Sequence, residues 1–80
     1  MTPVQAARAI VAHHMEGTAL PAELIGPSDY PLIDPQTANA IVTVYDGLKK
    51  QSNKDKFDRM ELTRAGLFAW ELIGKLEEGK

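Results

Sequence analysis

Apolar and polar residues alternate with the period of an α-helix over three stretches of the chain. In the first stretch, one face carries Val4, Ala7, Ile10, Val11 and His14, and the other carries Ala6, Ala9 and Ala12. Thr2 is a good N-cap, Pro3 suits the first helical position, and Gly17 is a natural stop. We therefore expect a helix over residues 3–16, with small alanines that would let another helix approach closely.

The second stretch begins at Asp34, a good N-cap, with Pro35 at the first helical position. Its apolar stripe consists of Ala38, Ile41, Val44, Tyr45 and Leu48. The opposite face carries Gln36, Asn39, Thr43, Asp46 and Lys50. The β-branched residues raise a strand alternative, but the capping residues and the length favour a helix over residues 35–51.

The third stretch predicts a helix over residues 63–78, with Gly79 as its stop. Its apolar stripe consists of Leu62, Ala65, Gly66, Ala69, Leu72, Ile73 and Leu76. Between the second and third helices, residues 54–60 predict a short turn with Phe57 and Met60 pointing inward. We expect the three helices to share one core.

Residues 18–34 interrupt this pattern and predict a proline-rich loop. Pro21, Pro27 and Pro31 fix the backbone and remove hydrogen-bond donors, so no long regular element forms here. The segment still carries many apolar side chains: Leu20, Leu24, Ile25, Tyr30, Leu32 and Ile33. A freely solvated linker would not carry so many, so we expect the loop either to wrap the core or to present a binding surface.

Together these elements predict an all-α fold. We expect a small orthogonal bundle of three helices, one or two short turns, and the proline-rich loop between the first two helices. A chain of 80 residues makes a single domain, which we assign to residues 1–80.

Composition excludes several classes of protein. The chain has no cysteine, which excludes a disulfide scaffold, a thiolate zinc site and a cysteine nucleophile. The net charge of -2 argues against a strongly basic nucleic-acid binder. The N-terminus lacks a basic start followed by an apolar run, and the longest apolar run, 67–70, is far shorter than a membrane span. We therefore expect a cytoplasmic protein with no membrane partner.

Candidate catalytic and metal-binding residues are few. His13 and His14 point about 100° apart on a helix, so they do not readily share one metal ion. His14 falls on the apolar face near the helix end, where we expect a half-buried structural side chain. The glycines are isolated, neither serine lies in a nucleophile turn, and the carboxylates show no pairing. We therefore expect no enzymatic activity, no metal and no cofactor.

The segment 49–59 is the most basic part of the chain. Its five basic residues outnumber two acidic ones, which makes it locally +3: Lys49, Lys50, Lys54, Lys56 and Arg59 against Asp55 and Asp58. Residues 1–40 carry one basic and four acidic residues, or -3, so the molecule is electrostatically polarised. A solvated helix junction is the commonest meaning of such a segment. Docking to an acidic protein surface and docking to a nucleic-acid backbone are the alternatives.

Surplus apolar surface on the last helix is the positive indication of a function. The apolar stripe is complete without Phe68 and Trp70, which lie on its opposite margins, and without Leu67, which lies outside it. The proline-rich loop covers one margin in the simplest arrangement, whereas in the alternative Leu67, Trp70 and Gly74 form an exposed strip that meets a partner. Gly66 and Gly74 would let that partner approach closely. The predicted partner-binding residues are Tyr30, Leu67, Phe68 and Trp70.

The sequence therefore favours a non-enzymatic helical module that binds another protein, such as a small inhibitor or adaptor. Its size, helical layout and lack of a catalytic signature are similar to those of short accessory proteins from phages and mobile elements, a likeness of type that rests on no motif. One alternative is a homo-oligomer that completes its core by self-association and forms a composite ligand site. A second is a nucleic-acid-binding domain that uses the basic segment, and an enzyme centred on His14 ranks last.

Overall fold

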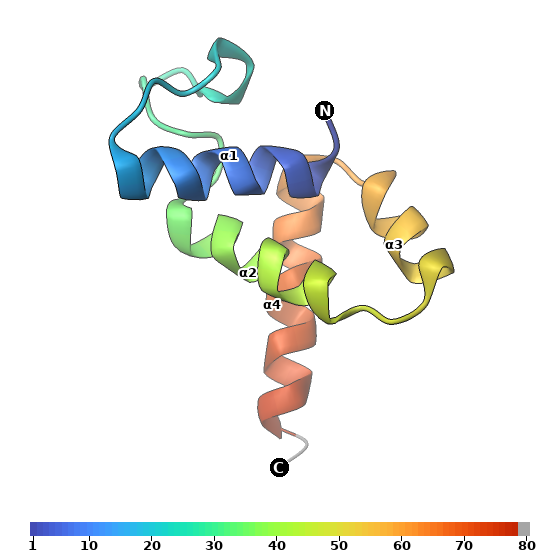
Figure 1. Cartoon of the computed structure of the whole chain (residues 1–80). Coiled ribbons are helices and arrows are strands. Elements are labelled where there is room, and N and C mark those ends of the chain that lie inside the picture. The colour runs from blue at the N-terminus through green and yellow to red at the C-terminus, as the bar shows by residue number, and fades with distance from the viewer. Residues whose placement is uncertain (79–80) are drawn as a thin grey trace.

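The computed structural model describes the backbone of residues 1–78 and the side chains of residues 1–75. Within that part of the chain, the elements follow one another as α1 (Pro3–Glu16), the 3-10 helix η1 (Ala22–Leu24), α2 (Pro35–Gly47), α3 (Gln51–Asp58) and α4 (Leu62–Glu78) (Figure 1). The predicted all-α class is confirmed, with four α-helices among the described residues where the sequence predicted three. The predicted core side chain of Leu76 and the predicted stop at Gly79 lie outside this description.

Local capping chemistry sets both ends of α1. The Thr2 hydroxyl accepts a hydrogen bond from the backbone N–H of Gln5, and the Gln5 side chain accepts one from the Thr2 N–H. This reciprocal arrangement satisfies two N–H groups that the first helical turn would otherwise leave unpaired. At the other end, Gly17 takes a left-handed φ of 69° and donates a 2.7 Å hydrogen bond to the carbonyl of His13.

Small side chains bring α1 and α2 together, and α1 packs mainly on α2. The buried alanines that make this possible are Ala6, Ala7, Ala38 and Ala40, beside the fully buried Ile10 and Ile41. Leu24 and Leu32 of the proline-rich loop line a hollow with Ala6, so the covered side of α1 is rotated from the predicted stripe toward Ala6 and His13. His14 is therefore exposed and His13 is half-buried, so the prediction of a half-buried His14 was wrong.

The second helix ends earlier than predicted. It stops at Gly47 instead of residue 51, and Leu48 leaves it with an extended backbone at φ −72° and ψ 127°. Glycine is a poor residue for continuing a helix. Leu48 follows with an extended backbone, and its side chain is half-buried. After this three-residue connection, the segment predicted as a short turn over 54–60 forms the two-turn helix α3 over Gln51–Asp58.

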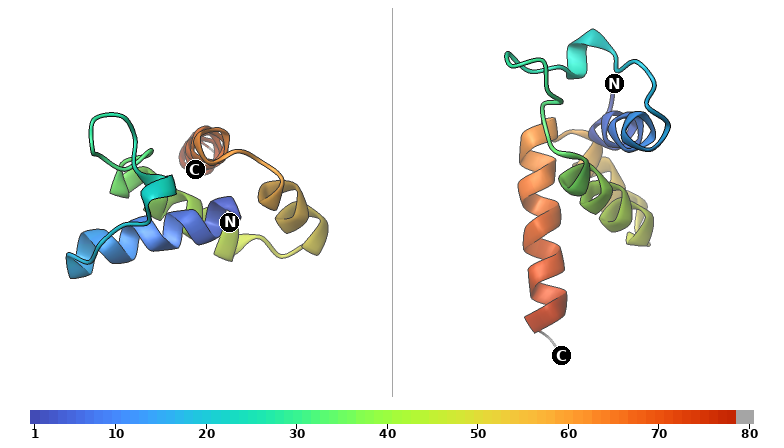
Figure 2. Two further views of the ribbon diagram at one scale, coloured as in Figure 1. Left: turned by 90° about the horizontal axis from the view of Figure 1, so that it is seen from above. Right: turned by 90° about the vertical axis from the view of Figure 1, so that its left-hand side faces the viewer.

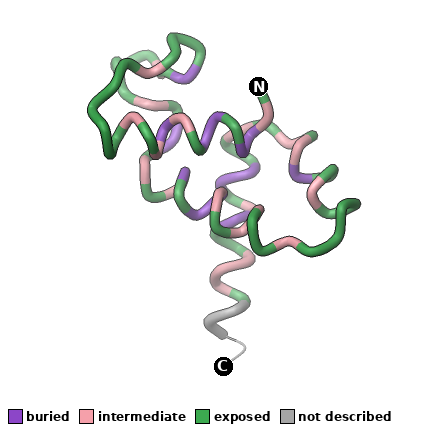
Figure 3. Tube along the Cα trace, viewed as in Figure 1, coloured by how far each residue is buried: buried purple, intermediate pink, exposed green. Residues whose placement is uncertain are grey.

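The core lies where α1 and α2 cross the N-terminal half of α4. Figure 3 shows the buried positions gathered at this crossing, while the C-terminal half of α4 extends beyond the other helices. Two further views show α1 and α2 side by side on one flank of α4, with α3 beside its N-terminal half (Figure 2). The largest fully buried side chains are Phe57, Ile10 and Ile41, one from each of the three shorter helices.

The proline-rich loop both covers the core and exposes apolar groups. Leu24 and Ile33 are buried and attach the loop to the core. Between them, an isolated antiparallel bridge joins Ile25 to Pro31, and Gly26 N–H donates a 2.6 Å hydrogen bond to the Tyr30 carbonyl. These bonds close a compact turn over residues 25–31, so this part of the loop has a hydrogen-bonded backbone.

Candidate partner-binding surfaces

Trp70 lies where α4 meets the first turn of α2. Its Nε1 donates a 3.0 Å hydrogen bond to Thr37 Oγ1, and the Thr37 hydroxyl in turn donates to the carboxylate of Asp34. A Cβ added at Gly66 would lie 2.7 Å from Thr37 Cγ2, so the two helices come this close because residue 66 is glycine. Gly66, which we expected to admit a partner, instead admits α2.

Leu67 and Trp70 share the outer face of α4. Leu67 is 68% exposed and Trp70 is 40% exposed, in spite of the hydrogen bond that fixes the indole. One turn further along, a Cβ added at Gly74 would meet nothing within 4 Å. Of the three residues of the predicted strip, Leu67 and Trp70 are therefore exposed, while Gly74 is half-buried with open space beside its backbone.

Phe68 belongs to a different surface. Its ring packs edge-on against Phe57 at 5.8 Å between centroids, and Phe57 packs in the same way against Tyr45, also at 5.8 Å. This row of three rings joins α4 to α3 and α3 to α2, with the fully buried Phe57 in its middle. Phe68 is half-buried on the margin of α4 opposite Trp70, so the two aromatics do not form one surface.

Tyr30, the fourth predicted partner-binding residue, is 72% exposed. It belongs to the turn over residues 25–31, which lies beyond the N-terminal end of α4 (Figure 2). Leu67 and Trp70 lie further along the helix. The structure therefore divides the four predicted residues among the outer face of α4, its inner margin and the loop.

The five basic residues of segment 49–59 do not gather on one face. Lys54 and Lys56 are two positions apart and so point about 200° apart around α3. The Lys54 ammonium lies 5.4 Å from the centre of the Tyr45 ring, while Lys56 lines a hollow beside Phe68 on the other side. Lys49 and Lys50 lie in the connection before α3, and Arg59 follows its end. This distribution does not make the continuous basic stripe that would track a nucleic-acid backbone.

A polar contact that the sequence did not indicate joins α2 to α3. The Tyr45 hydroxyl donates a 3.5 Å hydrogen bond to Asp58 Oδ2, while the other oxygen of this carboxylate is buried with no hydrogen-bond partner. Burial raises the pKa of the Tyr45 phenol, and the negative charge of Asp58 raises it further. The phenol is therefore protonated at neutral pH and serves as a donor that holds α3 against α2.

An apolar groove runs between the C-terminal half of α4, the end of α2 and α3. It consists of two adjoining hollows of about 330 Å³ and about 320 Å³, which share Leu48 and Leu72. The first hollow is lined by Thr43, Val44, Gly47, Leu48, Leu72, Ile73 and Lys75, and the second by Leu48, Asn53, Lys56, Met60, Phe68 and Leu72. Each hollow has one lysine at its edge, so we call the whole the lysine-rimmed groove. Sequence reasoning missed it because its walls come from three helices and the two connections between them.

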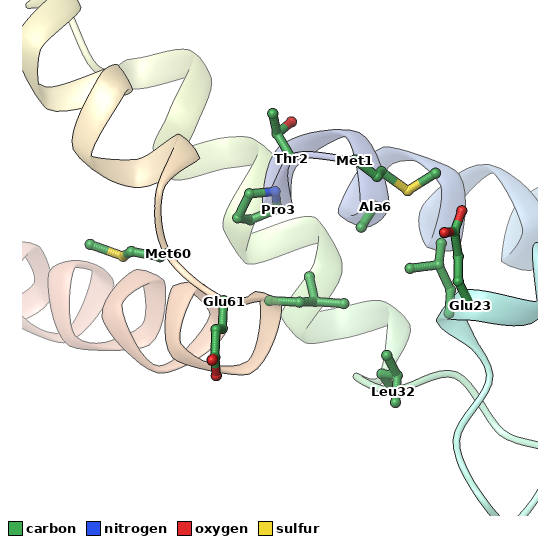
Figure 4. Close-up of a pocket in the computed structure, with 10 residues that line it drawn as sticks. Met1, Thr2, Pro3, Ala6, Glu23, Leu32, Met60 and Glu61 are labelled. Carbon is green, nitrogen blue, oxygen red and sulfur yellow. The ribbon is translucent and has the colours of Figure 1, made fainter.

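Another hollow of about 280 Å³ lies beside the N-terminus of α1. Its walls include Met1, Leu32, Glu23 and Glu61. Figure 4 shows Glu61 and Met60 pointing away from Met1 and Glu23, so the lining groups do not converge on a common point. This arrangement does not assemble an acid and a base around one substrate atom.

The described residues hold no group of three His, Asp or Glu side chains that could bind a metal ion. Over the same residues, no helix is both long enough and apolar enough to span a bilayer. Comparison of the chain with models of protein families, with curated proteins and with solved structures gave no match.

Proposed function

We propose that the chain is a cytoplasmic, non-enzymatic protein-binding module, of the kind that serves as a small inhibitor or adaptor. Its partner is an amphipathic helix with acidic residues beside its apolar face, which binds in the lysine-rimmed groove. The observation that carries the proposal is an apolar groove with a lysine at the edge of each hollow.

The apolar part of the groove supports a helix as the occupant. Leu48, Phe68 and Leu72 are only partly buried, so each has apolar area left to cover. An amphipathic helix placed in a groove covers such side chains with anchors one or two turns apart. Each apolar Å² removed from water contributes roughly 25 cal/mol, which gives the groove its affinity without any chemistry of its own.

The rim supports an acidic occupant. Lys56 and Lys75 are exposed, and neither forms an ion pair with a residue that the structure describes. Charges at the rim of an interface select partners of opposite sign and speed their association. The local charge of +3 over residues 49–59 adds to this field.

A selection experiment tests this proposal. A displayed library of helical peptides is selected on the immobilised chain, and the enriched peptides are titrated against Lys56→Glu/Lys75→Glu and Lys49→Glu/Lys50→Glu variants. Both double variants change the net charge equally, but Lys49 and Lys50 line neither hollow. We expect enrichment of acidic amphipathic peptides, a loss of affinity of tenfold or more in the first variant and a much smaller loss in the second.

Two results would contradict the proposal. One is enrichment of peptides without acidic residues beside an apolar face. The other is an equal loss of affinity in both double variants, which would indicate a non-specific response to net charge. Circular dichroism of each variant confirms that all have kept the fold.

A further inference from the structure

We propose that α4 pairs with α4 of a second copy of this chain, in antiparallel orientation, through Leu67 and Trp70. Arg64 and Glu71 set the register of the pair. This inference does not rest on the function proposed above, because the lysine-rimmed groove lies on the opposite margin of α4, beside Phe68 and Leu72.

The outer face of α4 has the spacing of a two-helix seam. Thr63, Leu67, Trp70 and Gly74 follow one another at intervals of four, three and four residues, which is the spacing of the a and d positions of a coiled coil. In the right-hand view of Figure 2, the other helices all lie on one side of α4. Leu67 is 68% exposed, so most of its surface is open to solvent.

Charge complementarity identifies a second copy as the occupant. Arg64 and Glu71 are exposed, and each directly follows a seam residue, Thr63 or Trp70. When two such helices run antiparallel with Leu67 packed against Trp70 of the second copy, each Arg64 comes opposite the Glu71 of the other chain. The surface is thus complementary to itself under a twofold axis. In a parallel pair these two residues, which occupy the same heptad position, would not meet.

The two charges are available for this contact. Neither Arg64 nor Glu71 forms an ion pair with any residue that the structure describes. They are seven residues apart, or roughly 10 Å along the helix, which is too far for an ion pair within one chain. The twofold arrangement forms two ion pairs, each between Arg64 of one copy and Glu71 of the other.

Trp70 is prepared for the contact. The hydrogen bond from its Nε1 to Thr37 fixes the indole while a face of it remains exposed. A side chain that is already ordered loses less conformational entropy on binding. The seam has only four residues per chain, so we expect a small interface and a dissociation constant on the order of 10–100 μM.

Sedimentation equilibrium of charge-reversed variants tests the pairing. We expect the wild type to dimerise, while Arg64→Glu and Glu71→Arg each weaken the dimer by tenfold or more, since each places like charges opposite one another. An equimolar mixture of the two variants restores attraction at both contacts. It should therefore form a heterodimer at least as readily as the wild type forms its homodimer.

Two matched variants complete the test. Leu67→Glu should abolish the dimer without unfolding the chain, because Leu67 is exposed. Lys56→Glu/Lys75→Glu in the groove should leave the dimer unchanged. A wild type that is monomeric up to about 1 mM would overturn the inference. So would single charge reversals that dimerise as the wild type does, or a mixture of the two that stays monomeric.

Discussion

The two margins of α4 carry one aromatic residue each, and the fold treats them differently. Phe68 packs against the ring of Phe57 and becomes part of a row that reaches Tyr45. Trp70 instead meets the hydroxyl of Thr37, donates to it and keeps 40% of its surface exposed. The neighbouring helix decides the outcome, because α3 brings an apolar ring to one margin and α2 brings a polar first turn to the other.

The difference also separates two kinds of surface. The Phe68 margin borders a groove with lysines at its edge, which suits an acidic partner. The Trp70 margin leads to a flat helix face with Leu67 at its centre and both signs of charge beside it, which suits a second copy. The two proposed interactions therefore use different margins of α4.

The largest expected effect lies on the Phe68 margin. Phe57 is fully buried and contacts the rings on both sides of it, so Phe57→Ala should destabilise the fold by about 3–5 kcal/mol. Phe68→Ala should cost about half as much, because Phe68 is only half-buried. Urea unfolding followed by circular dichroism measures both. If Phe57→Ala does not fold, Phe57→Leu can be measured in its place. A larger loss of stability in Phe68→Ala than in the Phe57 variant would contradict the described packing.

A smaller effect is expected on the Trp70 margin. Gly66→Ala places a methyl group 2.7 Å from Thr37 Cγ2, which should cost about 1–3 kcal/mol. Adding Thr37→Ser should recover most of this loss, because serine lacks the clashing methyl and keeps the hydroxyl that accepts from Trp70. Gly74→Ala is the matched control. Its added Cβ meets nothing within 4 Å, so it should stabilise the helix by up to about 1 kcal/mol. Equal losses for the two alanine variants would refute the close approach of α2 and α4.

The smallest effect concerns pH and the Tyr45 end of the aromatic row. The pKa of Tyr45 is raised above its ordinary value of 10.0 by burial and by Asp58, so the folded chain holds this proton more tightly than the unfolded chain does. The tighter hold on this proton stabilises the fold below pH 10.0, and this stabilisation is lost as the pH rises through the pKa of Tyr45 in the folded chain.

Urea midpoints measured across this alkaline range check the prediction. They should fall less steeply in Tyr45→Phe than in the wild type, since that variant has no proton to lose there. Tyr30→Phe, at an exposed tyrosine, should behave as the wild type does. If the urea midpoint of Tyr45→Phe fell with pH as steeply as that of the wild type, the pH dependence would belong to other groups.

Local signals were sufficient for α1 and for the start of α2. Thr2, Pro3 and Gly17 act on backbone groups within a few residues of themselves, and the resulting helix spans Pro3–Glu16. Asp34 likewise occupies the N-cap of α2, although its carboxylate accepts from the Thr37 hydroxyl and not from a backbone N–H. The end of α2 was missed although Gly47 signalled it, because the apolar period continues through Leu48.

One of the two candidate sites was within reach of such local reasoning, and the other was not. The exposed strip on α4 follows from periodicity alone, since a residue outside the apolar stripe of a helix faces away from the core. The lysine-rimmed groove does not, because its lining residues range from Thr43 to Lys75 and no spacing relates them. The basic segment reads as one patch along the chain, yet α3 turns Lys54 and Lys56 to different sides.

By itself, the sequence determined where the three long helices lie along the chain and roughly which side of each avoids water, because backbone capping and hydrophobic periodicity act over a few residues. Only the tertiary structure decided how far each helix is rotated, and with it whether His13 or His14 is covered and whether Gly66 faces a neighbour or solvent. The physical reason is that packing depends on the shapes of side chains that are distant in sequence. The methyl group of Thr37 lies against Gly66, which is 29 residues further along the chain, and no local pattern indicates this contact.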